Sequence, residues 1–218
     1  MKKNIMSIVM VLGASRGIGL ETVNQALDSG HQVKAFARSA NDIAITHPAL
    51  TKIAGDALDE QALTSALQGV DVVIQTLGLK PGAGMIFDRV DLFSKATRAL
   101  LSAMGRAKVK RLIAVTGFGA GNSRNSGGPL YEIGFNIFLR RAYSDKDVQE
   151  SLIRQSDLDW TIVRPVILYD GAHTGRYHVL IEPRRWRIGF VSRANVADFL
   201  VKQIDDRACL GKTPVITG

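Results

Sequence analysis

The sequence has 218 residues, 46% of them hydrophobic and 22% charged, and carries a formal net charge of +8. These proportions are typical of one globular domain and exclude a disordered or fibrous chain. The single cysteine, Cys209, excludes an intramolecular disulfide and favours a reducing, cytoplasmic location.

The positive charge is spread along the chain, and only 6% of the residues are aromatic. This pattern favours a small anionic ligand over nucleic acid as the partner. The opening run "MKKNIMSIVMVLG" is shorter than the ~18 apolar residues of a membrane span and ends in a glycine turn. We therefore expect a buried first strand there and no membrane insertion. We also expect the protein to be a monomer or a homodimer.

Apolar runs alternate with amphipathic segments along the whole chain. The runs predict strands at 5–12, 32–37, 51–54, 71–77, 110–116, 160–164 and 213–217. The amphipathic segments predict helices at 17–29, 59–67, 87–105, 130–155 and 194–206. This alternation predicts an α/β fold, namely a doubly wound parallel sheet (Rossmann fold) in three α/β/α layers within a single domain, 1–218. Two less regular segments, 117–130 and 166–193, are expected on the substrate side, the first as a loop over the site.

The stretch "VLGASRGIG" at 11–19 follows the first predicted strand and opens the first predicted helix. In that context its glycines are typical of a dinucleotide-binding turn. Gly13 permits the tight turn, Gly17 lets the backbone approach phosphate, and Gly19 allows the helix to pack closely on the strand. The residues expected to bind the cofactor here are Gly13, Ser15, Arg16, Gly17, Ile18 and Gly19.

Two arginines indicate which dinucleotide is bound. Arg38 stands at the end of the second predicted strand, where an acidic residue would bind the free ribose hydroxyl of NAD. Arg16 lies within the glycine turn and can reach the same position. A guanidinium accommodates a 2′-phosphate, so the pair favours NADP(H) over NAD(H). The alternative is two solvated arginines.

Two further strand ends carry candidate cofactor contacts. Asp56 is positioned to accept the adenine amino group, with Ala57 packed on the ring, although Asp56 also suits a helix N-cap. Asp59 fits that capping role better. Thr76, Leu77 and Gly78 end the fourth strand and are expected near a cofactor ribose.

With these residues in place, the chain resembles the atypical short-chain dehydrogenase/reductases, in particular the NmrA-like proteins and the flavin reductase (biliverdin-IXβ reductase) group. The resemblance is carried by "VLGASRGIG", "GDALDEQALTSALQGVDVVIQTLG", "KDVQESLIRQSDLDWTIVRP" and "VSRANVADFLVKQI". It implies that Pro165, Val166 and Ile167, which follow Arg164, line the nicotinamide pocket. The alternative for these three residues is ordinary packing at a strand end.

The resemblance also implies a catalytic tyrosine, a lysine four residues later, and a serine at the end of strand five. Lys146 matches the lysine, but Ala142 holds the tyrosine position and Tyr143 lies only three residues before Lys146. Strand five ends in Thr116 and Gly117, so one hydroxyl remains at most. The catalytic candidates are therefore Lys146, Thr116 and Tyr143. No metal site is expected, because His173 and His178 lack a supporting acidic cluster.

These residues predict an NADPH-dependent oxidoreductase that transfers a hydride to a small conjugated acceptor, flavin-like or quinone-like. An anionic acceptor is expected to dock at the basic group before the last helix, with Trp186 stacking on it; the alternative role of this group is a solvated edge. The group consists of Arg184, Arg185, Trp186, Arg187 and Arg193. A non-catalytic NADP(H)-sensing regulator of the NmrA-like type is the second interpretation. A sugar-nucleotide epimerase is the third, disfavoured by the lack of a C-terminal substrate domain.

Overall fold

The computed structural model describes residues 6–78, 91–123 and 140–218, with backbone only at 140–143. The main elements, in chain order, are β1 (Ile8–Leu12), α1 (Gly17–Asp28), β2 (Gln32–Ala37), β3 (Leu50–Ala54), α2 (Glu60–Ala66), β4 (Val72–Gln75), α4 (Leu92–Ala107), β5 (Arg111–Val115), α6 (Arg140–Arg154), β6 (Asp159–Pro165), β7 (Ile167–Tyr169), β8 (His178–Leu180), β9 (Phe190–Ser192), α7 (Arg193–Lys202) and β10 (Val215–Thr217).

The central sheet has eight strands in the order β3-β2-β1-β4-β5-β6-β10-β8. Its strands pair in parallel except at one edge, where β8 runs antiparallel to β10. The chain reverses the direction of winding between β1 and β4, and ligands of such sheets bind at the carboxyl ends of the strands beside this point. The predicted doubly wound Rossmann sheet is confirmed.

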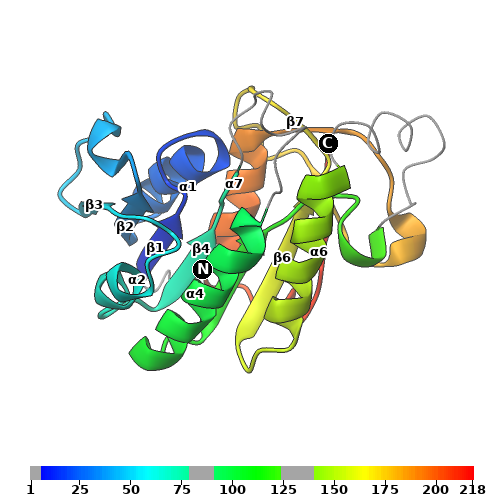
Figure 1. The fold of residues 1–218 in the computed structure, drawn as a ribbon. Coiled ribbons are helices and arrows are strands. Elements are labelled where there is room, and N and C mark those ends of the chain that lie inside the picture. Colours follow the sequence, from blue (N-terminus) through cyan, green and yellow to red (C-terminus); the bar gives the residue numbers. More distant parts are fainter. Residues whose placement is uncertain (1–5, 79–90, 124–139) are drawn as a thin grey trace.

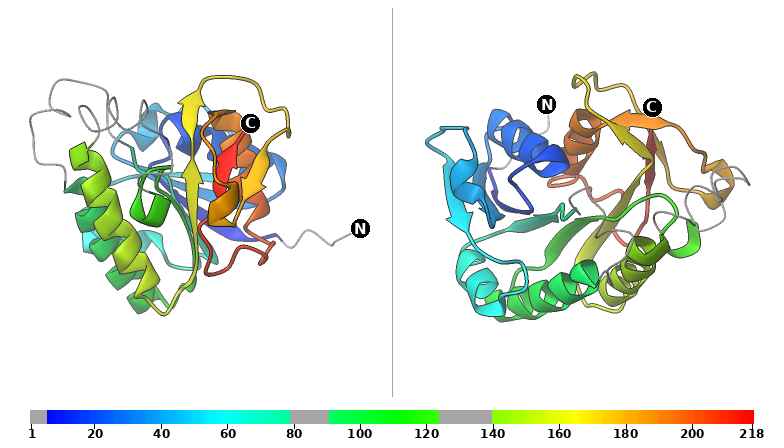
Figure 2. Two further views of the ribbon diagram at one scale, coloured as in Figure 1. Left: turned by 90° about the vertical axis from the view of Figure 1, so that its right-hand side faces the viewer. Right: turned by 45° about the horizontal axis from the view of Figure 1, so that its top comes forward.

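Helices cover both faces of the sheet, as Figures 1 and 2 show. Helices α1 and α7 pack together on one face, and α2, α4 and α6 form the layer on the other. Strand β1 shows how the sequence builds two cores: Val9 and Val11 point to the α1/α7 side, while Met10 and Leu12 point to the opposite side. Because both faces are covered, β1 is apolar at every position rather than at every second one.

The segment 166–193 contains three short strands that the sequence did not predict. Strands β7 and β9 form a separate two-stranded parallel sheet, and β8 extends the edge of the main one. Three residues are too few to show a hydrophobic period, so only the pairing partners reveal them. Parts of three other predictions, the helical residues 87–90 and 130–139 and the loop residues 124–130, lie outside the described residues.

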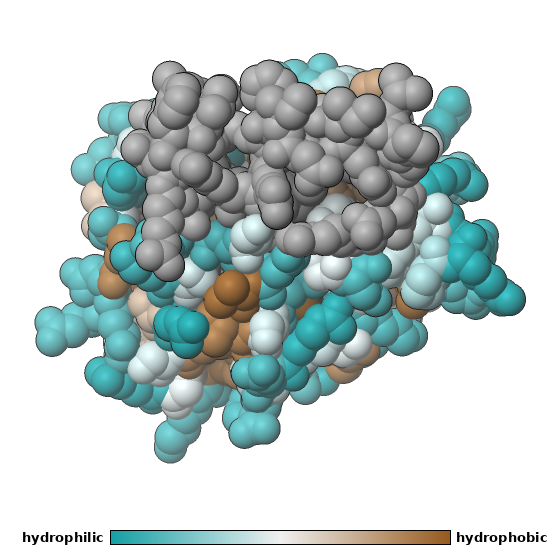
Figure 3. Space-filling model, turned by 45° about the vertical axis from the view of Figure 1, so that its right-hand side comes forward, coloured by the Kyte–Doolittle hydropathy of each residue, from teal (hydrophilic) through white to brown (hydrophobic). Residues whose placement is uncertain are grey.

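Among the described residues, no helix is long and apolar enough to cross a membrane. The face drawn in Figure 3 is mostly polar, with a smaller apolar area below the grey atoms.

Candidate functional site

A pocket of about 1060 Å³ opens at the carboxyl ends of the central strands. This is the upper end of the ~300–1,000 Å³ range of small-molecule and cofactor sites. The predicted site residues on its wall are Gly13, Ser15, Arg16, Gly17, Ile18, Arg38, Asp56, Ala57, Thr76, Leu77, Gly78, Thr116, Lys146 and Pro165. Residues from six strand ends and two helices therefore meet at one site.

The glycine turn has the backbone that the sequence requires. Gly13 has φ +92° and Gly17 has φ +56°, which are left-handed values that favour glycine. A Cβ atom on Gly13 would lie 3.0 Å from the carbonyl carbon of Thr76, so a side chain there would push two strand ends apart. A Cβ on Gly17 would meet nothing closer than the Arg193 side chain, at 3.7 Å. The turn is thus closed toward the sheet at Gly13 and comparatively open at Gly17.

Helix α1 begins without a side chain that caps it. Its N-cap residue, Arg16, makes no capping hydrogen bond, and the first turn contains no acidic residue. Within the helix itself, no side chain therefore caps the first amide groups, and no acid offsets the positive end of the helix dipole. This arrangement fits the phosphates of a dinucleotide.

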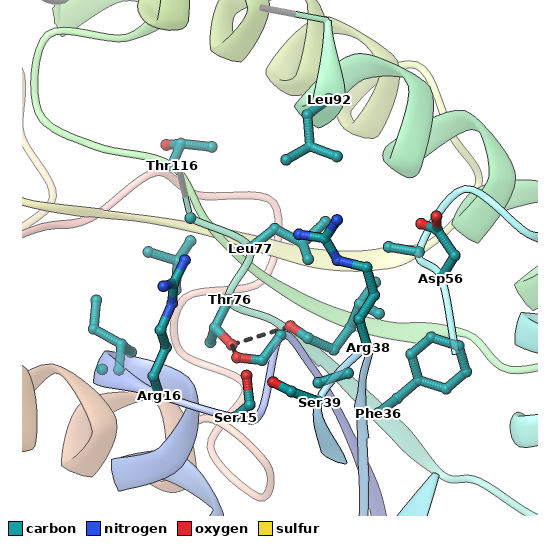
Figure 4. A pocket seen from close by; sticks show the side chains of 18 of the residues that line it. Ser15, Arg16, Phe36, Arg38, Ser39, Asp56, Thr76, Leu77, Leu92 and Thr116 are labelled. Atoms are coloured by element: carbon teal, nitrogen blue, oxygen red, sulfur yellow. Dashed lines mark hydrogen bonds between the residues drawn. The ribbon is translucent and has the colours of Figure 1, made fainter. Parts of the chain in front are cut away.

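Gly19 lies behind the pocket wall. A Cβ on Gly19 would lie 2.7 Å from the Thr76 hydroxyl and overlap the Gly13 carbonyl, so this glycine permits α1 to pack on the sheet. The Thr76 hydroxyl donates to the Leu12 carbonyl at 3.0 Å, among the bonds drawn in Figure 4. Thr76 and Gly19 together fix the distance between the helix and the floor of the pocket.

Arg16 and Arg38 extend into the same pocket from different elements. Figure 4 shows Arg16 rising from the start of α1 and Arg38 from the end of β2, with Ser15 and Ser39 between them. Both arginines are exposed. The one carboxylate on the described wall, Asp56, accepts the amide proton of Leu58 at 3.0 Å. The capping role falls to Asp59, as predicted, which accepts the amide protons of Gln61 and Ala62.

Lys146 forms the inner end of the pocket. Its Nζ atom donates to the backbone carbonyl of Thr116 at 2.6 Å and lies 4.4 Å from the centre of the Phe93 ring. Burial lowers the pKa of Lys146 from 10.5 to about 8, although the carboxylates of Glu150 and Asp145 act in the opposite direction. The amine is therefore held by the Thr116 carbonyl, and its pKa lies below the usual lysine value.

The carboxylates on either side of Lys146 hold helix α6 in place. Asp145 accepts the amide proton of Phe93 at 2.7 Å, at the start of α4, and Asp147 accepts that of Gly121 at 2.6 Å. Helix α6 is thereby tied to α4 and to the loop after β5. The two contacts fix where Lys146 enters the pocket.

Thr116 belongs to a buried polar network behind the wall. Its hydroxyl donates to Glu150 Oε1 at 2.8 Å, and the same carboxylate accepts two bonds from Arg164, at 2.9 and 2.5 Å. Arg164 is fully buried and also donates to Asn122 at 2.8 Å. The "KDVQESL" and "VRP" stretches of the sequence therefore meet in one ion pair. The Thr116 hydroxyl proton points toward this pair.

Besides Gly19, two predicted site residues, Val166 and Ile167, are not on the described wall. Val166 is buried and its amide bonds to Ile216, whereas Ile167 is 40% exposed on β7. Tyr143 lies on helix α6, but its side chain is outside the part of the chain that the structure describes. The described residues contain no group of three histidine, cysteine, aspartate or glutamate side chains that could hold a metal ion.

Sequence reasoning did not assign the following wall residues to the cofactor: Leu12, Phe36, Ala37, Ser39, Gly55, Leu58, Leu92, Val115, Leu168 and Arg193, the last of which it placed with the acceptor-binding group. Most of them are neighbours in sequence of a predicted contact, so the strand ends were the available signal. Arg193 is different, because it belongs to the last helix and reaches the first turn only through the packing of α7 on α1.

The basic run before α7 is attached to the fold at two points. Trp186 donates to the Leu180 carbonyl at 3.1 Å, and the Arg164 guanidinium lies 5.3 Å from the centre of its ring. Arg184 pairs with Glu182 at 2.7 Å, and its side chain is 84% exposed. None of these side chains is on the described pocket wall.

The fold and this pocket define an NAD(P)-binding protein of the oxidoreductase type. The family model for NAD(P)H-binding proteins matches residues 13–207, and the chain belongs to that family, in an atypical short-chain dehydrogenase/reductase, NmrA-like group.

Curated relatives match part of their own length. The sterol demethylase protein B of Methylococcus capsulatus is 30% identical over 73% of this chain and 51% of its own. The photosystem II assembly factor Ycf39 of Cyanophora paradoxa is 30% identical over 79% of this chain and 49% of its own. The chain thus spans about half the length of these relatives.

Among solved structures, ChuY, an anaerobilin reductase from Escherichia coli O157:H7, has a TM-score of 0.78 and 26% identity, covering 97% of both chains. This similarity extends over the whole domain.

Proposed function

We propose that this protein is an NADPH-dependent reductase that transfers a hydride to a small conjugated acceptor, flavin-like or quinone-like. The observation that carries the proposal is the pocket itself: Arg16 and Arg38 extend into one part of it, and Lys146 is fixed at its inner end.

The two arginines support NADPH as the cofactor. A 2′-phosphate needs positive charge and hydrogen-bond donors. The two guanidinium groups supply both, one from the start of α1 and the other from the end of β2. No acidic residue follows β2 before Asp42, so the loop that carries Arg38 begins without a carboxylate. Phe36, Ala57 and Leu58 give the neighbouring wall an apolar surface suited to adenine, with Asp56 at its edge.

Lys146 is proposed to bind the nicotinamide ribose. The bound cofactor supplies the hydride. The chain's own task is to position the acceptor and exclude water, with Pro165 and Leu168 forming the apolar side of the inner pocket. Since the Thr116 hydroxyl donates to Glu150, it has no proton directed at an acceptor. Acceptors that take their proton from water therefore suit this site better than simple aldehydes.

The similarity to ChuY makes anaerobilin a further acceptor to test. The basic side chains of Arg184 and Arg187 would attract an anionic acceptor. In this proposal the protein acts in the cytoplasm, where its buried thiol, Cys209, stays reduced.

One observation favours a second function, a regulator that binds NADP(H) without catalysis. The Thr116 hydroxyl donates its hydrogen bond to Glu150, so it is not directed at a substrate as the resemblance to catalytic short-chain enzymes would require. In this case the pocket would bind both redox forms of the cofactor and transfer nothing.

The experiment follows NADPH absorbance with FMN, quinones, aldehydes and anaerobilin, for the wild type and for Lys146→Ala. The reductase proposal expects turnover of at least one conjugated acceptor, slower in the variant, and little or none of aldehydes. Tight NADPH binding without turnover of any of these acceptors supports the regulator instead.

A further inference from the structure

Arg193 is a charged residue of the pocket wall that the proposed function leaves unused. It is the first residue of α7, and its side chain lies over the glycine turn: a Cβ on Gly17 would be 3.7 Å from both its Cδ and its Nε atoms. The side chain is 30% exposed, so it is held against the pocket rather than extended into water.

The present partner of Arg193 is a weak one. Its Nη1 atom donates to Asp170 Oδ1 at 2.7 Å, and the Asp170 side chain is 93% exposed. An ion pair with one partner so open to water adds little to stability. A more highly charged anion in the pocket can therefore displace Asp170.

The surroundings of Arg193 supply the rest of an anion site. Helix α1 begins beside it, without a capping side chain and without an acid in its first turn, and Arg16 precedes that turn. The amide groups of the turn, the helix dipole and the guanidinium converge on the region that a dinucleotide's diphosphate occupies in a fold of this class. A planar guanidinium can bind phosphate oxygens through two parallel bonds.

We propose that Arg193 is a further cofactor-binding residue, which exchanges Asp170 for the diphosphate of the dinucleotide. The inference rests on the proposed cofactor site and adds two features to it. The first is a ligand from the last helix of the chain, and the second is a carboxylate, Asp170, that competes with the cofactor for that ligand.

The remainder of this loop does not depend on Arg193. The Asn195 side chain accepts the amide protons of Thr174 and Gly175 at 2.9 and 3.1 Å, and Ser192 donates to the Ala172 carbonyl at 3.2 Å. These contacts keep the segment after β7 in place when Arg193 moves. Substitution of Arg193 therefore tests binding rather than folding.

Titration calorimetry with three ligands tests the proposal. NADP⁺ and ADP carry a diphosphate, whereas adenosine 2′-monophosphate carries adenine and the 2′-phosphate alone. We expect Arg193→Gln to weaken NADP⁺ and ADP about 10-fold, the effect of losing one charge-assisted bond, and to leave adenosine 2′-monophosphate within about twofold. Arg106→Gln is the matched control, because it removes an arginine that also pairs with a carboxylate, Glu60, but lies off the pocket wall.

The Asp170→Asn variant tests the competition. It keeps the shape of the side chain and removes its charge, so NADP⁺ should bind several-fold more tightly while adenosine 2′-monophosphate is unchanged. The inference is overturned if Arg193→Gln binds NADP⁺ as the wild type does, or if it loses all three ligands equally. It is also overturned if Asp170→Asn fails to tighten NADP⁺ binding. If the wild type binds neither NADP⁺ nor NAD⁺, the proposed function itself fails.

Discussion

The Thr116 hydroxyl donates a hydrogen bond to Glu150 at 2.8 Å, while the Thr116 backbone carbonyl accepts one from Lys146 at 2.6 Å. One residue thus joins the pocket to the buried Glu150–Arg164 pair behind it. The side chain faces the structural network and the backbone faces the lysine. This division leads us to assign the hydroxyl to stability and the lysine to cofactor binding.

Thr116→Val should therefore destabilise the protein with little loss of activity. The change removes one hydrogen bond to a buried carboxylate, which costs about 1.5–3 kcal/mol. Urea unfolding measures the free energy, and NADPH oxidation with the best acceptor measures kcat. Thr116→Ser, which keeps the hydroxyl, is the control. Unchanged stability with a kcat lowered 100-fold would instead make the hydroxyl catalytic.

Glu150→Gln should be among the most destabilising single changes in the domain. Arg164 is fully buried, so the variant leaves a charge without its compensating carboxylate. Breaking a buried ion pair in this way costs about 3–5 kcal/mol.

A matched surface pair provides the comparison for that variant. Glu60 meets Arg106 at 2.6 Å, but the two side chains are 34% and 62% exposed. Glu60→Gln should cost no more than about 1 kcal/mol in the same urea experiment. Equal costs for the two variants would show that the Glu150–Arg164 pair does not hold β6 and α6 together.

Cofactor affinity should fall as the pH rises through about 8. Burial lowers the pKa of Lys146 to this value, so the amine is charged below it and neutral above it. A neutral amine attracts an anionic cofactor less and donates weaker hydrogen bonds. We expect the Kd for NADPH to increase between pH 7 and 9 in the wild type. In Lys146→Arg, whose guanidinium stays charged, it should change little over that range.

The lysine also predicts how stability varies with pH. Because its pKa is about 8 in the folded chain against an ordinary 10.5, the unfolded chain binds more protons between these values. The free energy of unfolding should therefore rise with pH in this interval, relative to Lys146→Met. A difference that is flat with pH would show that the pKa of Lys146 is not lowered in the folded chain.

Local patterns made the cofactor end of the site predictable. A tight turn between a strand and a helix needs glycine where φ is positive, and Gly13 and Gly17 both have left-handed φ values. Asp59 caps α2 because a short polar side chain placed before a helix meets its free amides. These features depend on a few adjacent residues, so the sequence contains them in full.

Features that depend on distant contacts were not predictable. Nothing near Asp145 indicates that it caps α4, and nothing near Arg193 indicates that it lies over Gly17. Likewise, the resemblance placed Thr116 among catalytic residues, but only the packing of α6 on β5 and β6 brings Glu150 within reach of its hydroxyl. Such contacts follow from how the layers pack, which a single sequence does not specify.

The claim that this pocket is built for NADPH is tested most directly by the ratio of its Kd values for NADH and NADPH, measured for the wild type and for Arg38→Asp. The account predicts that the wild type binds NADPH at least about 10-fold more tightly, the effect of one charge-assisted contact, and that the variant loses or reverses this preference. Equal affinity of the wild type for the two cofactors, or a preference that survives in Arg38→Asp, would contradict it.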